Sequence, residues 1–397
     1  MVGQAEWPVR KGKWGPNGRA ASAHGPTLAG TATHATWFWR HPPEGGRTLR
    51  PLLHPRLINP PTGDPGVLVE FLFERRALLL DIGDLTTLAQ RKMLRVSHAF
   101  VSHAHMDHFA GFERLLRTCF GRPAPLHLFG PEGFIDRVAA KLGGYTWNLA
   151  PGYANDFVIT ATALSDDGTA RRTTFHSRRG FAREGEETVA VPDGVLLAEE
   201  GVRVRAAVLD HGDIPCLAFA VEEPAHVNVW KARLEALGLT TGPWLRDLKR
   251  AVLRGDPDDT PVSAAVPGAG MRVLPLGTLR GQVLSVVPGQ RIAYVVDAAF
   301  TPRNAERIVG LARGADVQFI ETPFLDADAG IAGARNHLTA GQAGRLAAAA
   351  GVGRIVPFHY SPRYTGREED LAREAEAAFR TASGGVGAAA PAPDCLG

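Results

Sequence analysis

Residues 102–108 read Ser102-His103-Ala104-His105-Met106-Asp107-His108 and follow a short apolar run that favours a buried strand. His103 and His105 are two positions apart, so on an extended chain their side chains project to the same side and can bind one ion. Asp107 and His108 come after the turn and can reach a second ion beside the first. Nitrogen and oxygen ligands without cysteine suit Zn²⁺, and also Mn²⁺ or Fe²⁺. The motif therefore predicts a metal centre, and the alternative is a solvated His-rich turn in which Asp107 caps a helix.

Four side chains cannot complete two metal sites, so other segments must supply further ligands. We expect these where a strand ends in a loop, because side chains at strand tips face a common rim. Three residues meet this condition: His211 after the apolar run 202–210, Asp297 after Tyr294-Val295-Val296, and His359 after Ile355-Val356-Pro357-Phe358. Each alone is typical of a turn residue, but together with the histidine motif they form a predicted ligand set.

The order of apolar runs indicates the fold class. Residues 67–73 and 77–82 are strand-like and are joined by Glu74-Arg75-Arg76, which is typical of a hairpin. Later in the chain strands and helices alternate, from the strand-like residues 291–296 to a charged helix over 367–382. Early hairpins followed by alternation favour an α+β fold in which two sheets pack on each other between helices.

The chain resembles the metallo-β-lactamase superfamily, and within it the ribonuclease Z family of tRNA 3′-processing endonucleases. The resemblance runs from about Val67 to Tyr364 and rests on Leu80–Gly83, His103–His108, Asp210-His211, Ile214–Phe219, Val296-Asp297, Ile320–Phe324, Asn336–Thr339 and Phe358–Tyr364. It implies a four-layer αβ/βα sandwich that holds two divalent ions, with Zn²⁺ preferred. By this resemblance His103, His105 and His211 would hold one ion, Asp107, His108 and His359 the other, and Asp297 would bridge both.

Glu321 and His337 resemble the family's Glu and His from two loops that flank the metals. Cleaving a phosphodiester needs an acid for the departing ribose oxygen, and a carboxylate behind a histidine fixes its tautomer and favours imidazolium. We therefore expect His337, backed by Glu321, to protonate the leaving 3′-oxygen, while Asp107 ligates and orients the attacking water. The alternative is that His337 only precedes the helix over residues 340–350, with Thr339 as its cap.

Residues 222–262 include a possible substrate arm. Two short helices are predicted over 230–254, and the second places Arg246, Lys249 and Arg250 on one face. This resembles the family's tRNA-gripping arm, whose basic surface would bind backbone phosphates without reading bases. The alternative is a solvated amphipathic helix packed on the body. Residues 171–179 are a second basic segment, for which a surface loop without a partner is favoured.

Composition bounds the remaining possibilities. The 397 residues include 44 Lys+Arg and 41 Asp+Glu, a balance that by itself indicates no partner. The 3 cysteines exclude a disulfide framework and a cysteine-based zinc knuckle, and no apolar run approaches the about 20 residues of a membrane span. Residues 1–19 lack the apolar core of a secretory signal, so we expect a cytoplasmic protein without a membrane partner.

We expect a flexible extension over residues 1–48, a hydrolase domain over 49–365, and a C-terminal helix with a flexible tail over 366–397. The predicted function is dinuclear-metal removal of the 3′ trailer from precursor tRNA, with a homodimer as an open option. Val296-Asp297-Ala298 replaces the family's usual Gly-Asp-Thr. Two alternatives therefore stay open: a hydrolase of the same fold that acts on a small or cyclic phosphodiester, a thioester or a lactone, and a catalytically silent RNA-binding scaffold.

Overall fold

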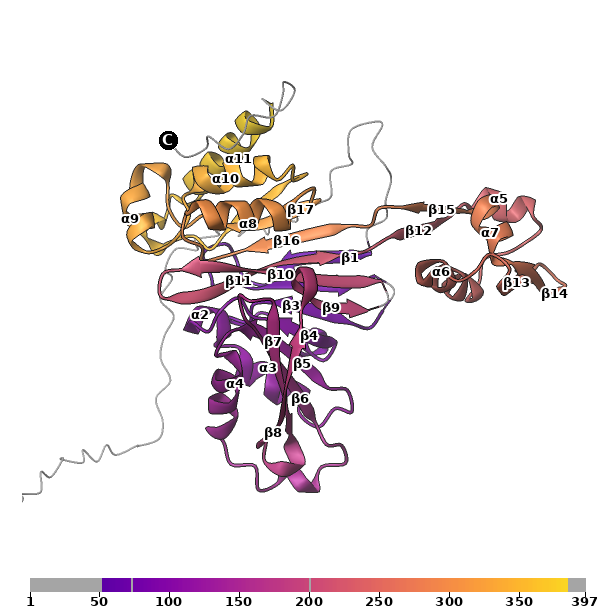
Figure 1. The fold of residues 1–397 in the computed structure, drawn as a ribbon, viewed down its shortest axis with the longest axis horizontal. Helices are drawn as coiled ribbons and strands as arrows, with labels where there is room; N and C mark the ends of the chain where they lie inside the picture. Colours follow the sequence, from indigo (N-terminus) through magenta and orange to yellow (C-terminus); the bar gives the residue numbers. More distant parts are fainter. Residues whose placement is uncertain (1–51, 73, 200, 385–397) are drawn as a thin grey trace, which may run out of the picture. The chain divides into compact units, whose positions relative to one another are not determined.

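Two large β-sheets pack face to face in the computed structural model, which describes residues 52–72, 74–199 and 201–384 (Figure 1). The first sheet has the strand order β1 to β8: β1 Leu53–Leu57, β2 Val67–Phe71, β3 Ala77–Leu80, β4 Val96–Phe100, β5 Leu126–Pro131, β6 Val158–Leu164, β7 Thr169–His176 and β8 Arg183–Ala190. The second has the order β18-β17-β16-β11-β10-β9: β9 Val195–Glu199, β10 Val202–His211, β11 Ile214–Glu222, β16 Arg291–Val295, β17 Val317–Glu321 and β18 Ile355–Phe358.

Strands β2 to β4 of the first sheet are mostly buried on both faces, which explains their continuous apolar runs. Successive side chains of a strand point to opposite faces. In β2, Val67 and Val69 join the core between the two sheets, while Leu68 joins the core under the helices. In β3, Leu78 and Leu80 face the second sheet, and the leucine between them faces the helices. A strand covered on both sides must therefore be apolar at every position.

Helices cover the outer face of each sheet (Figure 1). On the first sheet these are α3 (Phe112–Cys119) and α4 (Phe134–Gly143). On the second sheet they are α8 (Pro302–Ala312) and α10 (Ala340–Ala349), with α11 (Glu368–Gly384) packed against α10. Shorter helices are α1 Gln90–Met93, α2 Met106–Phe109 and α9 Ala329–Ala334. The order helix, sheet, sheet, helix confirms the four-layer αβ/βα sandwich expected from the sequence.

A separately packed unit lies between β11 and β16 in the sequence. It consists of β12 His226–Val229, α5 Lys231–Ala236, α6 Trp244–Arg254, β13 Pro261–Val266, β14 Gly270–Pro275, α7 Leu276–Val283 and β15 Leu284–Val287. Its own core includes Leu234, Leu248 and Leu279. The unit continues past residue 262, the end expected from the sequence, because β13, β14 and α7 supply part of that core. The predicted extension over 1–48 and the tail after 384 lie outside the described residues, and the predicted domain boundaries stay predictions.

The basic segment 171–179 is not the loop that the sequence favoured. Most of it forms β7, which pairs with the acidic strand β8. Arg171 lies 3.4 Å from Glu186, and Arg172 lies 3.2 Å from Glu187, measured between guanidinium nitrogen and carboxylate oxygen. The prediction was wrong because the pairing partners come from the next strand.

Among the helices of the described residues, none is both long enough and apolar enough to cross a membrane.

Strand direction brings several strand ends to one edge of the sandwich. β16, β17 and β18 are parallel, and β10 runs in the same direction because both β10 and β16 are antiparallel to β11. In the first sheet β3, β4 and β5 are also parallel. Loops that follow these strands therefore gather at the edges where parallel strands end, which is where side chains from distant parts of a sequence can meet.

Replacing Phe219 by Ala should lower the free energy of unfolding by about 3–5 kcal/mol. Phe219 is fully buried between the sheets, and its ring meets that of Phe100 edge-on at 5.7 Å. Chemical denaturation measures the effect. Leu149→Ala is the control: this side chain is 74% exposed, so its loss should change the free energy by less than about 0.5 kcal/mol. Equal losses in the two variants would contradict a stabilising role for the packing between the sheets.

Candidate metal centre

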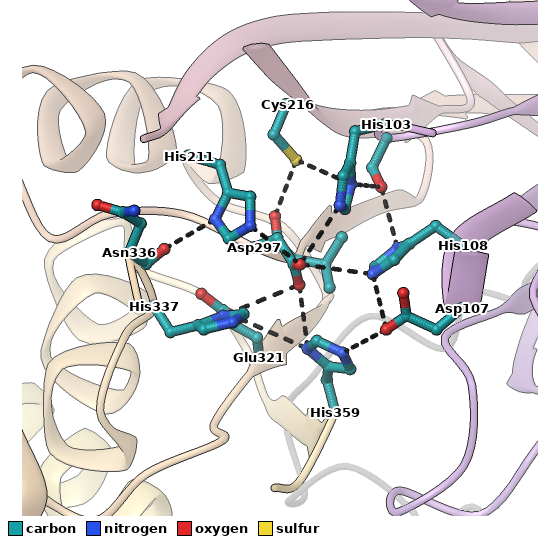
Figure 2. Close-up of polar contacts among 12 residues, drawn as sticks. His103, Asp107, His108, His211, Cys216, Asp297, Glu321, Asn336, His337 and His359 are labelled. Carbon is teal, nitrogen blue, oxygen red and sulfur yellow. Dashed lines mark hydrogen bonds and ion pairs between the residues drawn. The ribbon is translucent and has the colours of Figure 1, made fainter. Parts of the chain in front are cut away.

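The predicted ligands gather at one edge of the sandwich, and all but His105 are labelled in Figure 2. His103 follows β4, and His105 is the residue before α2, whose first turn carries Asp107 and His108. The helix begins within the motif, so the two histidines before it and the two residues inside it lie on different sides of the turn. The other three come from the second sheet, where His211 ends β10, and Asp297 and His359 follow β16 and β18 closely.

Two ligand groups result, together with a third group around the candidate acid. Within each group, one ligating atom per residue lies within 4.8 Å of all the others. The groups are His103, His105, His211 and Asp297; Asp107, His108 and His359; and Asp297, Glu321, His337 and His359. The structure therefore brings the predicted ligands together in two sets that correspond to the two ions expected from the resemblance.

Asp297 belongs to the first and third of these groups, and it also approaches His108 and His359 of the second. Its Oδ2 lies 3.5 Å from each Nε2 atom of His103, His108 and His211. Its Oδ1 lies 3.0 Å from Nδ1 of His359. In a tetrahedral zinc site with bonds of about 2.0–2.1 Å, neighbouring ligand atoms are about 3.4 Å apart. The spacing around Asp297 thus fits donors that share an ion.

Buried atoms without partners also point to ions. Among the described residues, Nε2 of His103 and Nε2 of His108 are buried and have no hydrogen-bond partner. A buried polar atom without a partner is costly and rare. Divalent cations would supply these atoms with partners, so the residues present fit a metal centre with nitrogen and oxygen ligands.

The backbone at the site is held in an unusual conformation. Within the described chain, four of the six non-glycine residues with positive φ lie here: Asp81 (57°), Asp297 (48°), Asn336 (59°) and His359 (60°). The left-handed region is disfavoured for residues with a Cβ atom, and such strain persists only where the surrounding structure enforces it. At Asp297 and His359 the turn that follows β16 or β18 directs the side chain toward the shared centre.

Protons and metal ions would compete for the histidine nitrogens. Burial lowers the pKa of His103 to about 2, which leaves a lone pair available. Burial also opposes charge on His108, but Asp297 and Asp81 raise its pKa to about 10. Burial also opposes charge on His359, but the negative charge of Asp297 makes the largest contribution to raising its pKa above the ordinary value. Because ligation requires the neutral imidazole, binding of ions here would release protons.

Glu321 and His337 form a hydrogen-bonded pair beside the ligands (Figure 2). Nδ1 of His337 donates to Oε2 of Glu321 at 2.8 Å, and Oε1 accepts from the backbone N–H groups of Ala298 and Leu338 at 2.9 and 3.1 Å. Burial opposes ionisation of Glu321, but His337 lowers its pKa to about 2. Glu321 in turn raises the pKa of His337 against the effect of burial. Thr339 caps α10 as expected, which leaves the His337 side chain free for this pair.

Several supporting residues were not predicted. Asp81, Ser102 and Tyr294 form a buried network behind His103 and His108, and the backbone carbonyl of Asn336 accepts from Nδ1 of His211 at 2.9 Å. The sequence feature that could have predicted this network is Asp81, a carboxylate directly after the buried strand β3. That strand runs parallel to β4, which precedes the histidine motif.

The predicted substrate-binding residues belong to the separately packed unit. α6 buries Trp244, Leu248 and Ala251, and it leaves Arg246 and Arg250 exposed. Lys249 is only half-exposed, and burial lowers the pKa of its amine despite the negative charge of Glu223. The three basic residues are therefore not equivalent, and the two arginines are the better placed for contact with a charged partner.

Comparison with known proteins gives close relatives in sequence. Ribonuclease Z of Deinococcus radiodurans is 34% identical over 311 residues, which cover 77% of this chain and 88% of the relative. Ribonuclease Z of Thermobifida fusca is 37% identical over 308 residues, covering 77% and 81%. Among solved structures, the metallo-β-lactamase fold protein YhfI from Bacillus subtilis matches 82% of this chain and 94% of its own with a TM-score of 0.47 and 15% identity. No family model matches the chain.

Asp297→Ala should reduce the metal content of the purified protein below the predicted two divalent ions per chain, because Asp297 approaches histidines of both predicted ligand sets. Elemental analysis of protein equilibrated with Zn²⁺ measures the content. His176→Ala is a matched control, because this histidine also contacts a carboxylate, Asp156 at 2.8 Å, but is in none of the ligand groups. Two ions retained in Asp297→Ala would contradict the shared site.

Proposed function

The chain belongs to the ribonuclease Z family, and we propose that it removes the 3′ trailer from precursor tRNA by endonucleolytic cleavage with two divalent ions. The observation that carries this proposal is the position of the candidate acid. Nδ1 of His337 lies 4.0 Å from Oδ1 of Asp297, the carboxylate that the predicted ligand sets share. Metal ions and a general acid can act together on a phosphodiester with a poor leaving group when both are within reach of one phosphate.

In this proposal His103, His105 and His211 would hold one ion, Asp107, His108 and His359 would hold the other, and Asp297 would serve both. Zn²⁺ is preferred, with Mn²⁺ or Fe²⁺ as options, because the donors are imidazole and carboxylate. When bound, the ions would polarise the phosphoryl oxygens and lower the pKa of a bound water molecule.

Asp107 is suited to orient the attacking water. Its side chain is 45% exposed, so it reaches the solvent side of the centre, where a substrate arrives. Burial opposes its ionisation, but the hydrogen bond from His359 and the charge of His108 lower its pKa to about 2. The carboxylate therefore accepts a hydrogen bond from water across the neutral pH range.

His337 is suited to supply the proton for the leaving group. Its side chain is 16% exposed, while that of Glu321 is fully buried, so only the histidine is accessible to a substrate. Glu321 holds Nδ1 and stabilises the imidazolium form, which leaves the Nε2 proton for the departing 3′-oxygen. A cytoplasmic location and assembly as a homodimer stay predictions.

His337→Ala should slow cleavage of a 3′-extended precursor tRNA by about 10²–10⁴-fold, because the ribose oxygen leaves poorly without a proton. Hydrolysis of an aryl phosphodiester should fall much less, because its leaving group needs no proton. Single-turnover assays on both substrates measure the two rates, and elemental analysis should show an unchanged metal content.

The same assays separate the alternatives. Glu321→Gln should give an intermediate loss on precursor tRNA, because the amide can still accept a hydrogen bond but no longer favours imidazolium. Equal losses on both substrates in His337→Ala would rule out its role as the acid. Wild-type protein that hydrolyses the aryl compound but leaves precursor tRNA intact would favour the small-phosphodiester alternative.

The arm generates a separate prediction. Replacing Arg246 and Arg250 together by Ala should weaken binding of precursor tRNA and reduce the slope of log Kd against log salt by about 0.7–0.9 for each phosphate that the variant no longer binds. Adding Lys249→Ala should change the slope by less, because that side chain is half-buried. Binding titrations at several salt concentrations measure the slope, and aryl phosphodiester hydrolysis should not change.

Arg171→Ala with Arg172→Ala is a matched control for the removal of two positive charges, because both arginines lie on β7 and not in the separately packed unit that contains α6. Equal changes in slope in the two double variants would show that only overall charge matters. Unchanged tRNA affinity of the α6 variant at every salt concentration would show that this helix does not contribute to tRNA binding.

A further inference from the structure

Asp81 is a fully buried carboxylate that accepts hydrogen bonds from four donors. Its Oδ1 accepts from the backbone N–H of Ser102 at 2.6 Å. Its Oδ2 accepts from the Ser102 hydroxyl at 2.9 Å, from Nδ1 of His108 at 2.8 Å and from the Tyr294 hydroxyl at 2.7 Å. A buried charge requires such compensation, yet Asp81 is in none of the predicted ligand groups.

This carboxylate reaches one histidine of each ligand group. It holds His108 directly, through Nδ1. It reaches His103 through Ser102: the hydroxyl donates to Asp81, so its oxygen can accept from Nδ1 of His103, which lies 3.0 Å away. In the neutral form that binds an ion, both histidines are then fixed in the tautomer that leaves Nε2 without a proton, and each Nε2 faces Asp297 Oδ2 at 3.5 Å. One carboxylate thus orients ligands of both ions.

Tyr294 connects this network to the opposite sheet. It lies in β16, three positions before Asp297, and is fully buried. Burial, and then the charge of Asp81, raise the pKa of its hydroxyl well above the ordinary value, so the group remains a donor. Within the network, Tyr294 is the donor from the second sheet, while Ser102 and His108 belong to the segment after β4.

We propose that Tyr294 is a positioning residue that, through Asp81, orients His103 and His108 at once, so that the two ion sites depend on one hydroxyl group. The inference rests on the two-ion site of the proposed function, but it does not depend on the substrate. It differs from a purely structural role of a core tyrosine because it predicts parallel changes in two separate metal affinities.

The test measures Zn²⁺ affinity by competition with a chromogenic chelator, without any substrate. Two backgrounds isolate the sites: His105→Ala weakens the first ligand group, and Asp107→Ala weakens the second. In each background, Tyr294→Phe should lower the affinity of the remaining site by about 10–100-fold. Ser102→Ala should lower the affinity that depends on His103 more than the affinity that depends on His108, because the shorter contact of His108 is with Asp81, at 2.8 Å against 3.2 Å to the Ser102 hydroxyl.

Tyr364→Phe is the matched control and should leave both affinities unchanged. Tyr364 is also buried, but its hydroxyl contacts Asp328 and the backbone N–H of Leu325. Unchanged affinities in Tyr294→Phe, or a change at one site only, would overturn the proposal. Failure of the parent protein to bind two ions would instead contradict the proposed function. Thermal unfolding of each variant verifies that the variant is folded.

Discussion

Asp297 is only 3% exposed, and a carboxylate at that depth is unfavourable unless cationic groups or hydrogen-bond donors surround it. Burial works against its ionisation, but the imidazoles of His359 and His108 hold its pKa well below the ordinary value. The histidines around it come from separate segments of the chain. Asp297 therefore makes electrostatic contacts with residues that follow strands of both sheets. The rest of the fold can be understood as the framework that makes this convergence possible.

That framework combines a rigid core with strained strand ends. Strands that are apolar on both faces fix the two sheets against each other and against the helices, and the residues after them leave the sheets in left-handed conformations. Strain of about 1–3 kcal/mol per residue can persist only where packing enforces it. The core therefore contributes to function, because it holds Asp297 and His359 in conformations that an isolated loop would not keep.

Chemistry and recognition are assigned to different parts of the chain in our proposal. The metal centre and the Glu321–His337 pair act on one phosphate, while α6 belongs to a unit with its own core. Binding energy from contacts remote from the reacting atoms can be used to position a large substrate. The hydrolysis rate of a small phosphodiester that makes none of these contacts would depend on the metal centre alone. Comparing the two substrate classes therefore separates the role of the metal centre from that of α6.

The sequence by itself determined the local features of this protein. The spacing of His103, His105, Asp107 and His108 predicted two ligand sets, because the geometry of a strand and of a helix turn follows from position along the chain. Strand ends predicted His211, Asp297 and His359 for the same reason, and the order of apolar runs predicted the sandwich. Only the tertiary structure decided which groups are partners. Tyr294 and Asp81 are 213 positions apart in the sequence, and the glutamates that pair with Arg171 and Arg172 come from another strand. The half-burial of Lys249 likewise depends on what packs around α6. Such pairings depend on register and packing between distant segments, and no local pattern of residues encodes them.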